Sequence, residues 1–262
     1  MTENVVLQYD RRGMVLLASY LPIHYCTRAA QDLLQQKRGK VLIVTGFYAY
    51  GAGETDGPAG AYFLAFALKN LGFSPIIVTD KYNFSYFSDK TIEVILFHPQ
   101  NIAELLYNCH ALISIERCGR AVDGQYYNMK KENISTKTPP LDDLFVAGKD
   151  ILQIGIGDGG NEIGMGNLQS IIEKELNIIP SCIKCHHLIV ATTSNWGAYG
   201  LINELGRATQ LSLLPLSLDI ETFTQDIIKK GAKDGISSLS TPTIDGFSLN
   251  IECDIVEQLR KL

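Results

Sequence analysis

The sequence has few cysteines and no long apolar run. Its 262 residues include six cysteines, namely Cys26, Cys109, Cys118, Cys182, Cys185 and Cys253. Six thiols are few for a chain of this length, and four of them lie in or beside apolar runs, so we expect reduced cysteines in a cytosol-like compartment. No apolar run reaches the ~18–20 residues that a helix needs to cross a bilayer.

Positive charge is also scarce. The chain has 23 Lys and Arg against 28 Asp and Glu, a net charge of −5, and no basic stripe of the kind that binds nucleic acid. Residues 1–10 carry Glu3 and Asp10 and lack the layout of a signal peptide. Apolar residues make up 46% and charged residues 19%, as in an ordinary packed globule. We expect a cytoplasmic protein with no nucleic-acid partner and no membrane association.

Two common catalytic motifs are missing, and two others are matched only weakly. The sequence contains neither a phosphate-binding G-x-x-x-x-G-K-[ST] loop nor a G-x-S-x-G nucleophile elbow. Residues 155–160 fit the dinucleotide pattern G-x-G-x-x-G, but the acidic side chains in and beside them would repel a pyrophosphate. Residues 182–187 hold one C-x-x-C followed by two histidines, where a closed zinc site needs four ligands. Packing at a strand entry explains that segment better.

A repeated order of strand, glycine-rich loop and helix runs along the chain. The strands are short, continuous apolar runs, which is typical of parallel strands buried on both faces. We therefore predict the α/β class, a three-layer sandwich with a mostly parallel central sheet. The expected strands are 41–45, 75–80, 93–97, 111–116, 151–156 and 187–192. The expected helices are 14–37 (with Pro22 as its point of division), 59–71, 102–109, 141–147, 168–176, 198–207, 223–230 and 253–262.

We expect one α/β domain over residues 1–262, with a catalytic core at about 41–207 and an irregular C-terminal part at 208–262. Unusual residues follow the carboxyl ends of the predicted strands at four places, where open α/β sheets bind ligands. The first place, residues 54–57, holds Glu54, Thr55, Asp56 and Gly57. The two carboxylates favour a ligand role, and capping of the following helix is the alternative.

The second place begins at Glu116, which ends an apolar strand, where a carboxylate is costly unless it is paired or needed. Arg117 and Arg120 could hold a carboxylate in a two-pronged geometry, and an internal Glu–Arg ion-pair cluster is the alternative. Asp123, Tyr127 and Asn128 follow on the same loop.

The third place, residues 155–166, has six glycines in twelve positions, so its backbone can approach a ligand closely. Its polar residues suit a cation, an ammonium group or acid–base chemistry, and a turn without function is the alternative. They are Asp158, Asn161 and Glu162, with Gly159 and Gly160 between them. At the fourth place, Ser194 and Asn195 offer an anion site at a helix start, with an N-cap beside a packed Trp196 as the alternative.

These loops resemble the D-glutamate cyclase family, whose members convert D-glutamate to 5-oxo-D-proline and water. The matching segments are 45–47, 54–61, 115–128, 141–145, 157–166 and 194–197, within about residues 41–207. Animal members of that family are longer, carry a further domain ahead of this one and are mitochondrial. We do not expect their location to carry over to this chain.

The resemblance implies an intramolecular amide formation, for which we assign roles from the residues themselves. A carboxylate base must neutralise the amine, and an acid or a metal must help the departing oxygen to leave. We expect Asp158 and Glu162 to divide the acid and base roles, with the pKa of one of them raised. The candidate catalytic residues are Glu54, Asp56, Glu116, Asp158 and Glu162; the candidate substrate-binding residues are Thr55, Gly57, Arg117, Arg120, Asp123, Tyr127, Asn128, Gly159, Gly160, Asn161, Ser194 and Asn195.

No cofactor is expected to be required. A divalent metal, Mg²⁺ or Mn²⁺, is the alternative, with Asp56, Asp158 and Glu162 as its ligands. The partner we expect is a small amino acid substrate, and a homo-oligomer stays open. Two other function classes compete: a metal-assisted hydrolase or lyase acting on another amino acid or lactam, and a binding module without catalysis.

Overall fold

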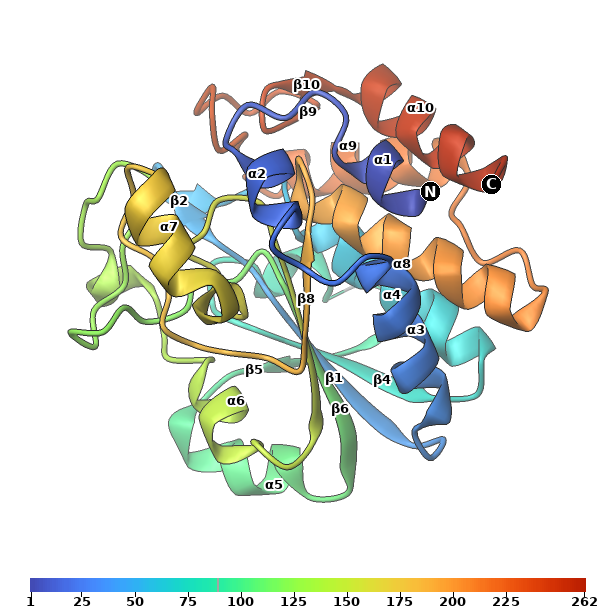
Figure 1. The fold of residues 1–262 in the computed structure, drawn as a ribbon, viewed down its shortest axis with the longest axis horizontal. Coiled ribbons are helices and arrows are strands. Elements are labelled where there is room, and N and C mark those ends of the chain that lie inside the picture. The colour runs from blue at the N-terminus through green and yellow to red at the C-terminus, as the bar shows by residue number, and fades with distance from the viewer. Residues whose placement is uncertain (89) are drawn as a thin grey trace.

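The computed structural model describes residues 1–88 and 90–262. Its helices and strands alternate along much of the chain (Figure 1). In chain order they are α1 (Thr2–Val6), α2 (Met14–Ala18), α3 (Tyr25–Gln35), β1 (Lys40–Thr45), β2 (Tyr48–Ala49), β3 (Ala52–Gly53), α4 (Pro58–Asn70), β4 (Ser74–Thr79), β5 (Glu93–Leu96), α5 (Ile102–Leu106), β6 (Cys109–Ile115), α6 (Asp143–Ala147), β7 (Leu152–Gly157), α7 (Gln169–Glu175), β8 (His187–Val190), α8 (Ser194–Thr209), α9 (Ser217–Lys229), β9 (Thr243–Ile244), β10 (Phe247–Ser248) and α10 (Leu249–Arg260). Short 3-10 helices cover Phe84–Tyr86, Pro99–Asn101, Ser135–Lys137 and Met165–Leu168.

Six of these strands form one sheet in the order β5-β4-β1-β6-β7-β8, and every neighbouring pair is parallel. After β1 the chain builds outward through β4 to β5, and it then returns to place β6 on the other side of β1. The direction of winding therefore reverses between β1 and β6. Loops that leave these two strands diverge, which opens a crevice at the carboxyl edge of the sheet.

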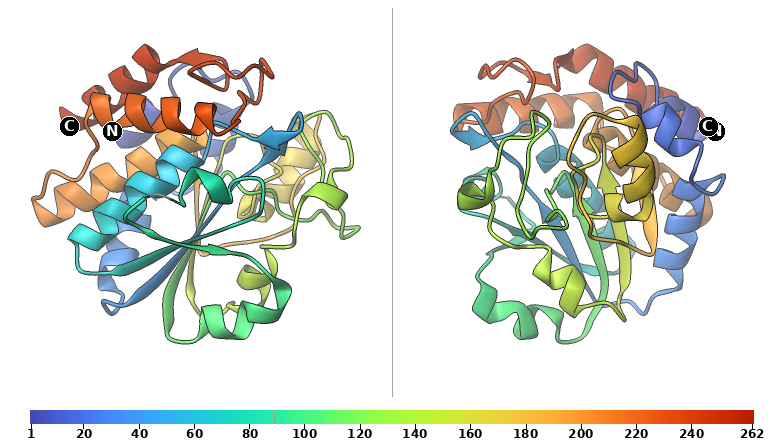
Figure 2. Two further views of the ribbon diagram at one scale, coloured as in Figure 1. Left: turned by 180° about the vertical axis from the view of Figure 1, so that it is seen from behind. Right: turned by 60° about the vertical axis from the view of Figure 1, so that its left-hand side comes forward.

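Each face of the sheet is covered by helices, so the molecule has three layers (Figures 1 and 2). Along β1, Val41 and Ile43 belong to the larger apolar cluster with residues of α3, α4 and α8, whereas Leu42 and Val44 belong to a second cluster with residues of α5 and α6. All four side chains are fully buried. The continuous apolar runs were thus correctly interpreted as strands buried on both faces.

The C-terminal segment is more regular than the sequence suggests. Helices α9 and α10 pack against each other, α10 also packs on α8, and buried residues of both helices belong to the larger apolar cluster. Between them β9 and β10 form an antiparallel hairpin whose turn is Asp245-Gly246. Both turn residues have positive φ, 50° and 78°, as a two-residue turn of this type requires.

Most predicted elements are present within a few residues of their predicted bounds. The predicted helix over 14–37 is divided into α2 and α3 around Pro22, as expected from the fixed φ of proline.

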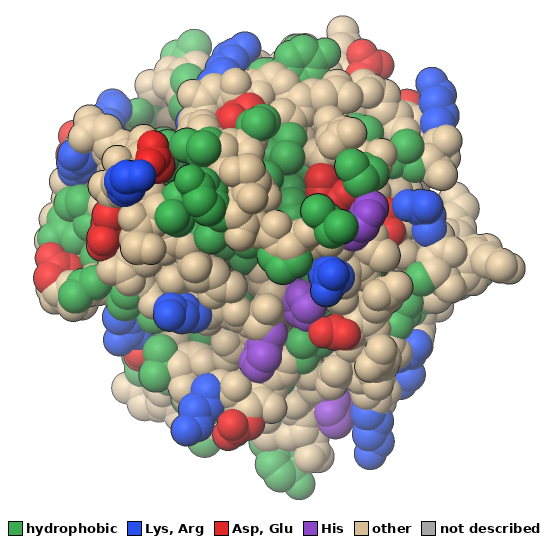
Figure 3. All heavy atoms as spheres, in the orientation of Figure 1, with side chains coloured by type: hydrophobic (Ala, Val, Ile, Leu, Met, Phe, Trp, Pro, Cys, Tyr) green, Lys and Arg blue, Asp and Glu red, His purple; other side chains and the backbone are tan. Residues whose placement is uncertain are grey.

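On the face shown in Figure 3, basic side chains are scattered among acidic ones rather than gathered in a stripe. Within the described residues, no helix is both long and apolar enough to cross a membrane.

Candidate functional site

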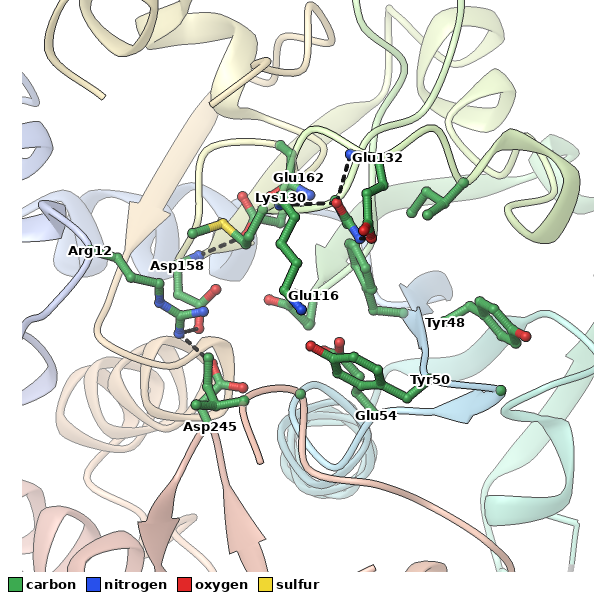
Figure 4. A pocket seen from close by; sticks show the side chains of 18 residues that line it. Arg12, Tyr48, Tyr50, Glu54, Glu116, Lys130, Glu132, Asp158, Glu162 and Asp245 are labelled. Carbon is green, nitrogen blue, oxygen red and sulfur yellow. Dashed lines mark hydrogen bonds and ion pairs between the residues drawn. The ribbon is translucent and has the colours of Figure 1, made fainter. Parts of the chain in front are cut away.

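A cavity of about 530 Å³ opens at the carboxyl edge of the sheet, beside the reversal point between β1 and β6 (Figure 4). Its volume lies within the range of roughly 300–1,000 Å³ that is usual for small-molecule sites. Five separate stretches of the chain line it. They contribute Arg12; Phe47, Tyr48, Tyr50, Gly51 and Glu54; Glu116, Asn128, Met129, Lys130, Glu132 and Ile134; Asp158, Asn161 and Glu162; and Gly235, Ile236 and Asp245.

Acidic side chains crowd the floor of this cavity. Oxygen atoms of Glu116, Asp158 and Glu162 all lie within 4.8 Å of one another, and so do oxygen atoms of Asp56, Asp158 and Asp245. Asp158 therefore stands between the two groups. These five carboxylates and Glu54 are all buried, so each must be stabilised by a proton, a hydrogen bond or a cation.

Glu116 has an unusual backbone conformation and a buried carboxyl group. It directly follows β6 and has a φ of 47°, a left-handed conformation that is uncommon outside glycine. Its side chain is 6% exposed, and one carboxyl oxygen accepts a hydrogen bond of 2.6 Å from the Ser194 hydroxyl. Burial raises the pKa of Glu116, and the nearby charge of Glu162 raises it further. Glu116 is therefore a buried group that favours its protonated form.

Asp158 differs from Glu116 because it has a cationic partner. The Arg12 guanidinium forms ion pairs with both Asp158 and Asp245, and it donates to the Thr192 carbonyl at 3.1 Å (Figure 4). Burial raises the pKa of Asp158, and the positive charge of Arg12 opposes that rise. The pKa of Asp158 is thus raised overall, but unlike Glu116 this carboxyl has a cation beside it that stabilises its ionised form.

Asp56 is not among the residues that line the cavity. Its side chain caps the N-terminus of α8. Its carboxyl oxygens accept the backbone N–H groups of Ser194 and Asn195 at 2.8 and 2.9 Å, and that of Gly57 at 2.9 Å. Burial raises the pKa of Asp56 to about 7, and these hydrogen bonds work in the opposite direction. The capping alternative therefore describes Asp56 well, although the helix that it caps is α8 and not α4.

Glu162 has a structural role in the glycine-rich loop. Its two oxygens accept the backbone N–H groups of Gly159 and Gly160, both at 2.7 Å, and one also accepts the Asp158 N–H at 3.3 Å. Backbone N–H groups that converge in this way form an anion-binding nest, which here binds a side chain of the same loop. Our expectation that Glu162 shares acid–base work with Asp158 is therefore not favoured, because three N–H groups already bind its carboxylate.

Glu54 lies at the edge of the floor under Tyr50 and packs against Gly235 (Figure 4). A Cβ atom added at Gly235 would come within 2.9 Å of the Glu54 carboxyl group, so a larger residue there would have to displace that carboxyl group. Burial raises the pKa of Glu54, and the charges of Asp245 and Asp56 raise it further. Like Glu116, Glu54 favours its protonated form.

Arg117 and Arg120, which we expected to hold a substrate carboxylate, pair instead with carboxylates of the protein itself. Neither residue lines the cavity. Arg117 is buried in an ion pair with Asp80 and donates to the carbonyls of Gly46 and Pro139 at 2.6 Å. Arg120 pairs with Asp142 and Asp143. The alternative of an internal ion-pair cluster is correct in kind, but the partners are these aspartates and not Glu116.

Several other candidates hold the loops in place without lining the cavity. The Asn195 side-chain oxygen accepts the N–H groups of Gly57 and Gly60 at 3.1 and 2.8 Å, which ties α4 to α8. Thr55 donates to the Thr243 carbonyl, and the exposed Asp123 accepts a bond from the Tyr127 hydroxyl. Of the twelve predicted substrate-binding residues, only Asn128 and Asn161 line the cavity; Thr55, Gly57, Arg117, Arg120, Asp123, Tyr127, Gly159, Gly160, Ser194 and Asn195 do not.

The fourth loop follows its alternative interpretation. Thr193 is the N-cap of α8, and its side chain accepts the Trp196 N–H at 3.3 Å. The indole of Trp196 is fully buried and donates to Glu252. The segment 182–187 also follows its alternative, because His186 accepts a backbone N–H from Gln153 and His187 pairs with Asp32 at 2.7 Å.

Sequence reasoning missed Arg12 and Asp245, two residues that lie outside the predicted core of 41–207. Arg12 stands in the loop before α2 with no motif around it. Asp245 had a usable signal, because an Asp-Gly pair between apolar residues is typical of a tight hairpin turn. That signal predicts the hairpin, but it does not predict where the hairpin packs.

The donor types around Asp158 suit Mg²⁺ or Mn²⁺, since both ions prefer carboxylate oxygen. The predicted trio of Asp56, Asp158 and Glu162 is divided, however, between the two groups described above. Both groups also have competing partners, because Arg12 pairs with Asp158 and Asp245, and backbone N–H groups bind Asp56 and Glu162. A metal ion at Asp158 would have to compete with the guanidinium.

Arg117→Met should destabilise the protein rather than only weaken a binding site. The substitution leaves Asp80 buried without its cation, and breaking a buried ion pair costs about 3–5 kcal/mol. We expect a fall of that size in the free energy of unfolding, measured by urea denaturation. Arg120→Met, whose parent side chain is partly exposed, is the matched control and should cost much less. An Arg117→Met variant of normal stability with impaired ligand binding would contradict the structural role.

Glu54→Gln should change how stability depends on pH. The pKa of Glu54 is raised from 4.5 on folding, so its contribution to stability is present below pH 4.5 and is lost as pH rises through the folded-state pKa. Glutamine stays neutral, and the variant should therefore gain melting temperature relative to the unaltered protein as pH increases from about 4.5. The exposed Glu173→Gln serves as the control. A difference that stays constant with pH, or decreases, would show that Glu54 is ionised in the folded protein.

The family model and the curated relative that match this chain both point to the same family. The sequence model of a family described as "D-glutamate cyclase-like, C-terminal" matches residues 6–260. Human "D-glutamate cyclase, mitochondrial" is 34% identical over 276 aligned residues, which cover 84% of this chain and 45% of the human protein. The chain thus spans about half the length of this curated relative.

Among solved structures, an exopolyphosphatase-related protein from Bacteroides fragilis aligns with a TM-score of 0.48 and 11% identity. That alignment covers 92% of this chain and 57% of the other. The family match extends over nearly the whole sequence, including the segments that bring Arg12 and Asp245 to the cavity. The chain belongs to the D-glutamate cyclase-like family.

Proposed function

We propose that this protein is a lyase of the hydro-lyase type that cyclises D-glutamate to 5-oxo-D-proline with loss of water. The observation that carries the proposal is that neighbouring carboxyl groups at the cavity floor lie in different electrostatic environments. Glu116 is buried without a cation on its carboxylate and favours the protonated form, whereas Asp158 lies against Arg12. An acid and a base are thus neighbours, with oxygen atoms within 4.8 Å.

The reaction needs this arrangement. The amine nitrogen attacks the γ-carboxyl carbon, a C–N bond forms and one C–O bond breaks. Two protons leave the nitrogen and end on the departing oxygen, which becomes water. We assign Asp158 to accept, one after the other, the two protons that leave the nitrogen, and Glu116 to supply the two that the departing oxygen takes up. Transfer of a proton from Asp158 to Glu116 after each step restores their starting states.

Binding the substrate in a folded conformation supplies much of the remaining acceleration. Intramolecular reactions between well-oriented groups have effective molarities worth about 7–11 kcal/mol. The amide of Asn161, held by its 2.8 Å bond to the Tyr127 carbonyl, lies in the cavity wall where it could also donate to the developing oxyanion. No ATP is needed, which agrees with a sequence that has no phosphate-binding loop.

We also propose a cytoplasmic location, because all six cysteines are free thiols, as is usual in a reducing compartment.

Asp158→Asn and Glu116→Gln should each lower turnover of D-glutamate by roughly a hundredfold or more, the usual scale for the loss of a general acid or base. Formation of 5-oxo-D-proline is the measurement, with thermal melting as a check that both variants fold. The exposed Asp254→Asn on α10 is the control and should retain normal turnover. Near-normal turnover of either cavity variant would contradict the role of that residue.

A panel of substrates separates this proposal from its rivals. Water loss from other amino acids, or ring opening of other lactams, would favour a hydrolase or lyase of different specificity. Ligand binding without turnover of any member of the panel would favour a binding module. Formation of 5-oxo-D-proline from D-glutamate above all others is the result that we expect.

We also propose that the reaction does not require a metal, because Arg12 already supplies positive charge beside Asp158 and Asp245. A divalent ion bound by Asp56, Asp158 and Asp245 would instead act as a Lewis acid toward the substrate carboxyl group. Turnover should survive exhaustive chelation with EDTA. If chelation abolishes turnover and added Mg²⁺ or Mn²⁺ restores it, the metal is required. The proposal that Arg12 alone supplies the positive charge beside Asp158 and Asp245 would then be wrong.

A further inference from the structure

Two loops meet across the mouth of the cavity through a cation and an aromatic ring. Tyr50 stands at the tip of the β2–β3 hairpin, and Lys130 stands in the turn that follows β6 by some fifteen residues. The Lys130 ammonium lies 5.2 Å from the centroid of the Tyr50 ring. Figure 4 shows the Lys130 side chain extending over the floor toward Tyr50. The pKa of Lys130 is raised by its side-chain hydrogen bond to Tyr50, so the ammonium form is favoured.

The turn that carries Lys130 is well defined. The Asn128 side-chain oxygen accepts the backbone N–H groups of Lys130 and Glu132, both at 2.9 Å, and the Asn128 amide donates to the Glu132 carboxylate at 2.7 Å. Asn128 therefore organises the turn, as this residue type often does. The next residue, Lys131, contacts Asn177 instead of the cavity. Adjacent lysines thus lie in different environments.

Lys130 is the cation at this cavity that has capacity for another anion. Among the described residues that line the cavity, only Arg12 and Lys130 are positively charged. Arg12 is already occupied by Asp158, Asp245 and the Thr192 carbonyl. Lys130 is exposed and carries three N–H donors, of which the tyrosine hydroxyl can use only one. Glu132 is the acidic residue that acts most directly on it.

The proposed reaction leaves one part of the substrate without a role at the floor. The amine and the γ-carboxyl group react there, but the α-carboxylate is unchanged and is retained in 5-oxo-D-proline. Beside those carboxyl groups of the floor that are ionised, this negative charge would be repelled. We propose, resting on the function proposed above, that Lys130 and Tyr50 form a subsite for the carboxylate that the substrate and the product share.

This subsite explains how an acidic cavity can accept an acidic amino acid. The reacting groups lie on the floor, where protonated carboxyl groups can donate, and the α-carboxylate lies at the mouth, where an ammonium and a hydroxyl group can donate to it. A ligand bound in this way contacts both loops. Lys130 and Tyr50 would then determine specificity for amino acids that carry a free α-carboxylate.

The test compares two lactams that differ only in the carboxylate, by isothermal titration calorimetry. One ligand is 5-oxo-D-proline and the other is 2-pyrrolidinone, which has the same ring without the carboxylate. Lys130→Met should weaken binding of 5-oxo-D-proline by about tenfold, the scale of a charge-assisted hydrogen bond, and should leave any binding of 2-pyrrolidinone within about twofold. Lys131→Met is the matched control and should change neither, and Tyr50→Phe should show a smaller, similarly selective loss.

The subsite is overturned if 5-oxo-D-proline fails to bind the unaltered protein, if Lys130→Met leaves its affinity within about twofold, or if Lys131→Met weakens it equally. It is also overturned if Lys130→Met weakens both lactams to the same extent. Selective weakening by Lys130→Met in a protein that forms no 5-oxo-D-proline from D-glutamate would support the subsite and contradict the proposed reaction, so the two failures are distinguishable.

Discussion

The site depends on one constraint: six carboxyl groups are buried around a cavity that has a single guanidinium at its floor. An ionised carboxylate in such a place is costly unless something stabilises it. The molecule uses three different solutions. Backbone N–H groups bind Asp56 and Glu162, Arg12 pairs with Asp158 and Asp245, and protonation is favoured at Glu54 and Glu116. Acid–base chemistry needs a carboxyl group that favours its protonated form beside one whose ionised form a cation stabilises. Glu116 and Asp158 are such a pair.

The sheet topology makes this crowding possible. Because the winding reverses between β1 and β6, the loops after these strands diverge and leave room for a cavity. Segments near both ends of the chain then complete it. Arg12 comes from the loop before α2 and Asp245 from the hairpin before α10, so their ion pair joins parts of the chain 233 residues apart. Without that guanidinium, Asp158 and Asp245 would lie buried on the floor with no ion-pair partner.

The fold followed from local patterns, whereas the pairing of charges did not. Continuous apolar runs such as residues 41–45 can be buried only on both faces of a sheet, and the carboxyl ends of parallel strands bring their loops to one edge. The ion pair of Arg117 with Asp80 was not predicted, because Asp80 follows a different strand and spacing along the sequence cannot rank such partners. Arg12 had no local signal at all, since its importance arises entirely from tertiary packing.

With D-glutamate as the proposed substrate, protonation of the carboxyl groups on the floor has a second effect besides supplying a general acid, because it also favours substrate binding. D-Glutamate carries two carboxylates, and a cavity with six ionised carboxyl groups would repel it. Each proton held by Glu54 or Glu116 would lower that repulsion, and in the proposed reaction the proton on Glu116 is also the one given to the leaving oxygen. Burial, which raises both pKa values, therefore serves binding and chemistry together. A single physical cause, the burial of these carboxyl groups beside the reversal point of the sheet, underlies both.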